Sequence, residues 1–305
     1  MRNLRLYDHA RPIAVHLDQG PVSLWVSQVP LQAGAKPRGR MLLLHGNPAN
    51  MHDFGAMAAH LGRALEVVAL DLPGFGRSDN IRPVRHESVL HTYARHVQAA
   101  VDRLGWAEPY YLLGHSHGAA VAQSMAALYP QRIARLLLLG SVGTPAHWGY
   151  RQLAVPGVMP SLRVLARALR LPSPRPVRRR LVRAIMTPIF APHPLPDEWI
   201  DTQLAVVDAR PEVLVNMALV ASGDPCSQLA NTAAAISAPT LFVHGAADRL
   251  VPTRHARAIH DIVARRCPAE FHELPGTGHM LHISHPDRIA QLALDWLDRS
   301  PTSTR

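Results

Sequence analysis

The stretch Gly114-His115-Ser116-His117-Gly118 constrains this chain more than any other. It follows the apolar run 110–113, which predicts a buried strand, and precedes an alanine-rich segment with the pattern of a helix. A serine at a sharp strand-to-helix turn, with a glycine two residues away on each side, is typical of a nucleophile elbow. Side chains at the glycine positions would collide with neighbouring segments. The turn would lift the Ser116 hydroxyl out of the sheet and leave the backbone N–H of His117 facing a developing negative charge. The alternative is a glycine-rich turn with an incidental serine.

Two further loops supply partners for such a serine in a suitable chain order. Asp248 ends a loop after the apolar segment 240–245, and His279 ends a glycine-rich loop after the segment 269–274. The carboxyl ends of parallel strands lie along one edge of a sheet, so the three side chains can meet there. A histidine can take the serine proton, and a buried carboxylate orients that histidine. We therefore predict a Ser116-Asp248-His279 triad.

A third loop predicts an anion-binding contribution. The apolar run 41–44 is followed by His45-Gly46-Asn47-Pro48, and the backbone N–H of Asn47 is the best candidate for a second donor beside that of His117. Two fixed donors would form an oxyanion hole for a tetrahedral intermediate.

Taken together, these motifs and the loop Asp71-Leu72-Pro73-Gly74-Phe75-Gly76-Arg77-Ser78 resemble those of the α/β-hydrolase superfamily. The resemblance spans about residues 40 to 280. It implies a mostly parallel, doubly wound α/β sheet with an inserted helical cap above the active site. It also implies that no metal or other cofactor is needed.

The residues at the nucleophile turn favour some members of that superfamily over others. Dehalogenases and epoxide hydrolases carry an aspartate nucleophile, usually followed by tryptophan, where this chain has Ser116 and His117. A serine attacks an acyl carbon, so we expect hydrolysis of carboxylic esters through an acyl-Ser116 intermediate, with a small-molecule ester or related acyl compound as substrate. A perhydrolase side activity is compatible with this.

Two alternatives stay open. Carbon–carbon bond hydrolases acting on ring-cleavage diketones use the same triad, although they often have asparagine before the serine and a glycine pair after it. Here those positions hold His115 and Gly118-Ala119. The second alternative is a non-catalytic ligand-binding protein on the same fold.

Alternation of strand and helix patterns predicts the domain organisation. Strands are expected near 40–45, 66–71, 110–115, 134–140, 240–245 and 269–274, after an antiparallel hairpin over 12–29. Helices are expected near 52–62, 88–104, 117–129, 252–264 and 285–298. The alternation stops between 142 and 230, where helical patterns and prolines predominate. We expect residues 1–141 and 231–305 to form the core and residues 142–230 to form the cap.

Composition excludes several classes of function. The chain has 305 residues and a formal charge of +10, and Lys36 is the only lysine, so the positive charge comes almost wholly from arginines. We find no nucleic-acid-binding module, so no nucleic-acid partner is expected. Cys226 and Cys267 lack metal-type spacing, no apolar signal region opens the chain, and no apolar run is long enough to span a membrane. These features favour a cytoplasmic protein without stable membrane insertion, and they leave its oligomeric state open.

The predicted cap carries features with two interpretations each. The arginine-rich run 175–183 is typical of a solvated helix face, and the alternative is a docking site for an anionic substrate or surface. Four aromatic residues could line a pocket or belong to the core: Trp148, Tyr150, Phe190 and Trp199. His45 and His115 are expected to pack beneath the oxyanion loop and behind the elbow, and a metal site is not expected.

Overall fold

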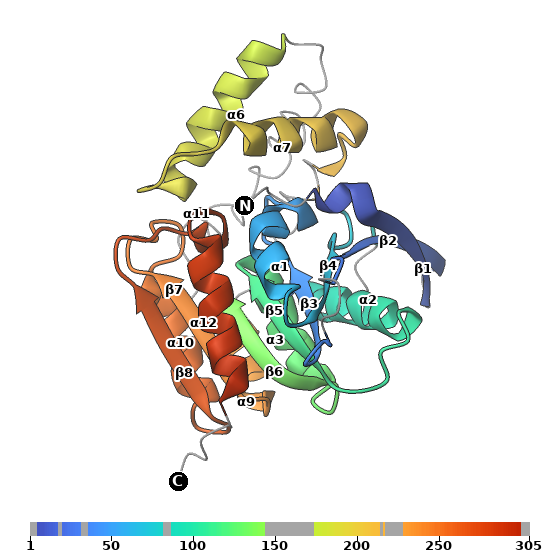
Figure 1. The fold of residues 1–305 in the computed structure, drawn as a ribbon, viewed down its shortest axis with the longest axis vertical. Helices are drawn as coiled ribbons and strands as arrows, with labels where there is room; N and C mark the ends of the chain where they lie inside the picture. Colours follow the sequence, from blue (N-terminus) through green and yellow to red (C-terminus); the bar gives the residue numbers. More distant parts are fainter. Residues whose placement is uncertain are drawn as a thin grey trace.

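The computed structural model describes residues 5–17, 20–31, 36–81, 87–143, 174–213, 216 and 228–299. Within them one sheet has the strand order β1-β2-β4-β3-β5-β6-β7-β8 (Figure 1). Its strands are β1 (Ala10–Leu17), β2 (Gly20–Gln28), β3 (Arg40–Leu44), β4 (Glu66–Leu70), β5 (Tyr110–His115), β6 (Ile133–Leu139), β7 (Thr240–Gly245) and β8 (Ala269–Leu274). The hairpin β1–β2 is antiparallel and joins β4 antiparallel, whereas every pairing from β4 through to β8 is parallel. The prediction of a mostly parallel α/β sheet after an opening hairpin is confirmed.

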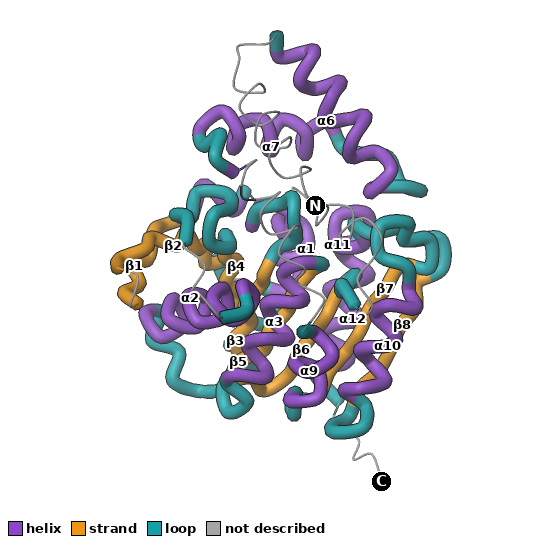
Figure 2. The backbone as a smooth tube through the Cα atoms, turned by 180° about the vertical axis from the view of Figure 1, so that it is seen from behind, coloured by secondary structure: helices purple, strands orange, loops and turns teal. Residues whose placement is uncertain are grey.

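Helices cover both faces of the sheet, because its central strands are apolar on both sides. On β3, Met41 and Leu43 join the hydrophobic core beneath one helical layer, and Leu42 and Leu44 join the core beneath the other. The first layer holds α1 (Gly55–Leu61) and α12 (Pro286–Asp298), with the short helices η1 (Leu6–His9), η2 (Met51–Phe54) and α11 (Leu281–Ser284) near it. The second layer, seen from behind in Figure 2, holds α2 (Val89–Arg103), α3 (His117–Leu128), α9 (Leu229–Ala235) and α10 (Thr253–Val263).

Two further helices, α6 (Arg175–Phe190) and α7 (Asp197–Ala209), lie outside these layers (Figure 1). They share a separate apolar cluster that also includes Met280, the residue after His279; its members are Met186, Phe190, Leu195, Trp199, Ile200, Leu204 and Met280. Both helices fall inside the stretch predicted to form a cap. Because residues 144–173 and most of 214–227 lie outside the described residues, the cap boundaries at 142 and 230 stay a prediction.

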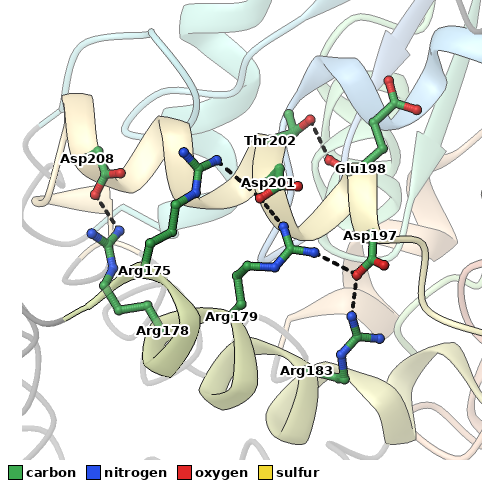
Figure 3. A network of polar contacts seen from close by, with 9 residues as sticks. All are labelled: Arg175, Arg178, Arg179, Arg183, Asp197, Glu198, Asp201, Thr202 and Asp208. Atoms are coloured by element: carbon green, nitrogen blue, oxygen red, sulfur yellow. Dashed lines mark hydrogen bonds and ion pairs between the residues drawn. The ribbon is translucent and has the colours of Figure 1, made fainter.

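The arginine-rich run on α6 is largely engaged with α7 (Figure 3). Arg179 lies 2.8 Å from Asp197 and also pairs with Asp201, while Arg178 pairs with Asp208. Arg175 and Arg183 complete the network. A single exposed ion pair contributes at most about 1 kcal/mol, but a network with shared carboxylates restricts how the two helices can slide. The run is largely exposed, as the first interpretation expected, and its arginines also form an inter-helix clamp, which neither interpretation anticipated.

No helix of the described segments combines the length and the apolar character that crossing a membrane requires.

Asp71, directly after β4, ties three segments to the end of that strand. Its Oδ1 accepts a hydrogen bond from the backbone N–H of Met51 (2.8 Å), and its Oδ2 accepts one from that of Arg77 (2.8 Å). The hydroxyl of Tyr7 donates to Oδ2 at 3.0 Å. Gly76 has φ +51°, and a Cβ there would lie 2.0 Å from Asp71 Oδ2, so only glycine fits. Burial raises the pKa of the Asp71 carboxyl to about 6, although the two backbone hydrogen bonds oppose that rise.

We predict that Asp71→Asn lowers the free energy of unfolding by about 1–3 kcal/mol, because an amide can accept only one of the two backbone N–H bonds and turns a donor toward the other. Since the pKa of Asp71 is raised on folding, its ionisation opposes folding. Stability should fall as pH rises from about 4 to about 6 in the wild type, and this slope should weaken in the variant. Urea unfolding at several pH values measures both effects. Asp298→Asn, which removes an exposed pair with Arg38, is the control; equal unfolding midpoints for the two variants would contradict the assignment.

Candidate active site

Ser116 occupies a strained turn between β5 and α3. Its φ is 51° and its ψ is −114°, and among the described residues it is the sole non-glycine residue with positive φ. A Cβ on Gly114 would lie 2.4 Å from the carbonyl oxygen of Gly118, and one on Gly118 would lie 2.2 Å from that of Leu44. The flanking glycines are therefore required by close backbone approach, which is the reason that the sequence pattern suggested. Strain of this kind persists only where the surrounding structure enforces it, and it is frequent at functional sites.

His279 and Asp248 form a buried pair beyond the ends of β8 and β7. The Nδ1 of His279 lies 2.7 Å from Oδ2 of Asp248, and both side chains are almost fully buried. The Oδ1 of Asp248 accepts hydrogen bonds from the backbone N–H groups of Leu250 (2.9 Å) and Val251 (2.8 Å). Burial would raise the pKa of the Asp248 carboxyl, but the charge of His279 and the hydrogen bonds from nearby histidines outweigh it and lower that pKa well below its usual value. A carboxylate on Nδ1 leaves Nε2 of His279 as the basic nitrogen.

His115 connects the serine turn to the histidine loop. Its Nε2 lies 3.0 Å from the carbonyl oxygen of His279, to which it can only donate, and the two rings are 4.9 Å apart. Burial first, and then the neighbouring His282 and His279, keep the pKa of His115 well below its ordinary value, so its ring is neutral. Within the described residues Ser116 Oγ makes no hydrogen bond. The transfer of its proton to His279 therefore stays a prediction of the sequence pattern.

The predicted oxyanion loop, residues 45–48, lies against the same turn. A Cβ on Gly46 would lie 3.1 Å from Cβ of Ser116, so glycine allows the loop to approach the serine. Asn47 and His279 line one small cavity, of about 10 Å³, together with His115 and Leu250. This places Asn47 next to the histidine; its backbone N–H as a donor to an oxyanion stays a prediction.

The side chains of His45 and His117 are buried and contact groups outside the predicted triad. His45 lies beneath the oxyanion loop, as expected: its Nδ1 donates to the carbonyl of Gly46 at 2.7 Å, its Nε2 accepts from the N–H of Leu72, and burial lowers its pKa to about 4. The ring of His117 packs against Tyr93, and burial lowers its pKa to about 3. The backbone N–H of His117 is thus its remaining candidate contribution. No group of metal-ligating side chains large enough to hold an ion is present in the described part of the chain.

An apolar cavity of about 170 Å³ borders the oxyanion loop on the side of α6 and α7. Its walls include Pro48 and Ala49 from the core and Trp199 from α7, alongside Leu181, Val182, Ile185, Met186, Leu204, Val207 and Val213. Trp199 also donates from Nε1 to the buried carboxyl of Asp53 at 3.0 Å, and Phe190 packs on its ring. Trp148 and Tyr150, the other aromatic candidates, lie outside the described residues. A larger cleft of about 950 Å³ against another face of α7 contains none of the predicted catalytic residues.

Two contributions were missed by sequence reasoning. Asp53 was not singled out, and nothing local in the sequence marks it as the partner of Trp199. His244 was also missed; it lies 3.3 Å from Oδ2 of Asp248. Its position four residues before Asp248, at the end of a predicted strand, was the available signal.

Comparison with known proteins gives consistent matches. A family model described as "alpha/beta hydrolase fold" matches residues 39–286. The 2-hydroxy-6-oxo-6-phenylhexa-2,4-dienoate hydrolase of Burkholderia cepacia is 28% identical over 263 residues, covering 84% of this chain and 87% of that protein. The 2-hydroxymuconate semialdehyde hydrolase of Pseudomonas sp. strain CF600 is 27% identical, covering 85% and 93%. A thermophilic esterase from Thermogutta terrifontis shares the fold, with a TM-score of 0.72 over 94% of this chain and 98% of that one at 24% identity.

We predict that Ser116→Ala abolishes covalent labelling by a fluorophosphonate probe, with a loss of at least about 10³-fold, because the activated oxygen is removed. Folding should be retained, since alanine keeps the Cβ that the turn already accommodates. Ser124→Ala is a matched control, because Ser124 of α3, like Ser116, is a buried serine whose Oγ lacks a hydrogen-bond partner in the described residues. Mass spectrometry of the labelled protein measures both. Undiminished labelling of Ser116→Ala would move the nucleophile to another residue.

Proposed function

The chain belongs to the α/β-hydrolase fold family, and from that premise we propose that it is a serine hydrolase that transfers an acyl group to water. The observation that carries this proposal is the 2.7 Å pairing of Asp248 with His279, whose backbone carbonyl is bound by the residue preceding Ser116. A buried carboxylate on one nitrogen of a histidine makes the other nitrogen a suitable base for a nearby hydroxyl.

The proposed reaction has two stages. Ser116 Oγ adds to the substrate carbonyl carbon while His279 Nε2 takes its proton, and the N–H groups of Asn47 and His117 stabilise the oxyanion. The bond to the leaving group breaks, the leaving group takes the bonding electron pair, and the proton on His279 passes to it. Water then gives a proton to His279 and adds to the acyl-Ser116 carbonyl. Release of the acid returns the proton to Ser116.

We propose that the substrate bond hydrolysed is a carbon–carbon bond. A hydroxy-oxo-dienoate, the compound in the name of the Burkholderia cepacia relative, contains no ester, so a hydrolase must cleave it between carbons. The leaving carbon can carry the electron pair because its enolate form is conjugated. We therefore rank carbon–carbon bond hydrolysis, one of the two alternatives left open by the sequence, ahead of ester hydrolysis. The ester remains the second candidate, because His115 and Ala119 replace the asparagine and glycine frequent in carbon–carbon hydrolases.

The apolar cavity indicates which chemical group of the substrate would lie beside the predicted oxyanion loop. Its walls are almost wholly aliphatic or aromatic. Among the described residues that line it, Arg178 is the one cation, and it is already paired with Asp208 of α7. An uncharged aryl or alkyl group would be buried there favourably, whereas a carboxylate would lose hydration without an available counter-charge. We therefore propose a substrate whose group at this position is apolar, such as the phenyl group in the relative's compound.

We expect the purified protein to hydrolyse 2-hydroxy-6-oxo-6-phenylhexa-2,4-dienoate with a kcat/KM at least about tenfold above that for the best of a series of nitrophenyl esters, a difference of about 1.4 kcal/mol in transition-state binding. Absorbance changes of dienoate and nitrophenol measure the two reactions. Ser116→Ala is the control for both. Faster hydrolysis of an ester than of the dienoate would restore the ester as the first choice.

Substitutions in the apolar cavity should change the preference for the apolar group while leaving the chemistry intact. Leu204→Ala and Trp199→Ala enlarge the cavity, and we expect the kcat/KM ratio between bulky and small apolar groups to change by about 10-fold or more, since pocket methylenes contribute about 1–3 kcal/mol each. Leu204→Ala is the cleaner of the two, because Trp199→Ala also breaks the hydrogen bond to Asp53. Thr202→Ala on the other face of α7 is the control. A uniform loss on all substrates, with no change in ranking, would exclude this cavity as the binding site.

A further inference from the structure

His244, near the end of β7, is a buried histidine that the reaction scheme above does not use. Its Nε2 lies 2.7 Å from the carbonyl oxygen of Val251 and 3.3 Å from Oδ2 of Asp248. A carbonyl oxygen can only accept, so Nε2 carries the hydrogen. The Nδ1 of His244 has no hydrogen-bond partner within the described residues. The N–H of Nε2 is directed at the region between Val251 and Asp248.

This places a second histidine on the carboxylate oxygen that also binds His279. Oδ1 of Asp248 is held by two backbone N–H groups, and Oδ2 lies between Nδ1 of His279 and Nε2 of His244. Gly245, the next residue, allows the two catalytic loops to approach, because a Cβ there would lie 2.3 Å from the carbonyl oxygen of Thr277. The carboxylate is therefore surrounded by donors on both oxygens.

We propose that His244 is a positioning residue: by sharing its Nε2–H between Val251 and Asp248, it holds Oδ2 in the plane and at the distance that His279 requires. This rests on the proposed function, in which His279 is the base. Sharing Oδ2 between two donors also reduces the negative charge that His279 alone would receive. Loss of the His244 donor should then leave the carboxylate less fixed, and should stabilise the protonated form of His279.

The other titratable groups around Asp248 and His279 would not produce the same shift in the pH profile. His115 of β5 and His282 of α11 are neutral over the range of an assay, since burial lowers the pKa of His282 to about 3 and that of His115 well below its ordinary value. On β8, Glu273 pairs with Arg257 of α10 at 3.2 Å near the surface. His255 is the buried histidine of α10. It is unchanged in every variant used below and so contributes equally to each profile.

The test compares His244→Phe with His244→Gln. Phenylalanine keeps the flat ring but removes the donor, and glutamine places its Nε2 where that of histidine lies. The rate of fluorophosphonate inactivation is measured against pH, because it requires an activated serine and no knowledge of the natural substrate.

For His244→Phe we expect the plateau rate to fall by up to about 100-fold from lost alignment. The midpoint of the acid limb, which is the pH at which the inactivation rate reaches half of its plateau on the acidic side of the profile, should move upward by about half a pH unit. His244→Gln should stay within about threefold of the wild type with an unmoved limb, as expected for a retained hydrogen bond. His272→Gln, a partly exposed histidine on β8, is the control, and Asp248→Asn marks complete loss of the acid.

The downfield proton resonance of His279 Nδ1–H, recorded by NMR on each folded variant, reads the same geometry without catalysis. It should shift in His244→Phe and return in His244→Gln. Equal behaviour of the two variants in both measurements, or an unmoved acid limb and resonance in His244→Phe, would overturn the positioning role. If the wild type does not label but its resonance responds as expected, the proposed function fails and the positioning of Asp248 by His244 stands.

Discussion

The parallel register from β4 to β8 is the constraint on which the site depends. It brings the ends of β3, β5, β7 and β8 to one edge, so that loops far apart in sequence lie side by side. The backbones meet closely there. A Cβ on Gly46 would lie 2.9 Å from Nδ1 of His115, one on Gly118 would lie 2.2 Å from the carbonyl oxygen of Leu44, and one on Gly245 would lie 2.3 Å from that of Thr277, so a side chain at any of these positions would force its neighbours to shift. Glycines at these points allow the loops to approach one another closely.

Three buried aspartates show how partners determine the state of a carboxyl. Asp53 has Trp199 as a donor and an Oδ2 without a partner in the described residues, and burial raises its pKa well above the ordinary value. Asp71 has two backbone N–H donors and a tyrosine, and its pKa rises only to about 6. Asp248 has two backbone donors and two histidines, and its pKa falls. Burial acts in the same direction at all three sites, so the number and charge of the donors decide whether the group is ionised.

The helices α6 and α7 pack against the residue after His279 and line a cavity beside Pro48 and Ala49. The arginine–aspartate clamp joins them to each other, and Met280 joins their apolar cluster directly beside His279. Under the proposed function, a substrate group in the adjoining cavity would contact side chains other than those of Asp248 and His279.

The sequence by itself determined the features that depend on local backbone. The glycines around Ser116 predict its strained turn, and the alternation of strands and helices predicts the sheet and its two helical layers. The chain order of Ser116, Asp248 and His279 predicts which loops carry the site, and the structure places Asp248 against His279. Tertiary structure alone decided which side chains meet across long separations. The arginines of α6 pair with aspartates of α7, and Asp53 accepts a hydrogen bond from Trp199. The side chain of His115 donates to the carbonyl oxygen of His279, and that of His244 lies 3.3 Å from Oδ2 of Asp248. The physical reason is that a hydrogen bond between distant residues depends on how elements pack, whereas a turn depends on the few residues that form it.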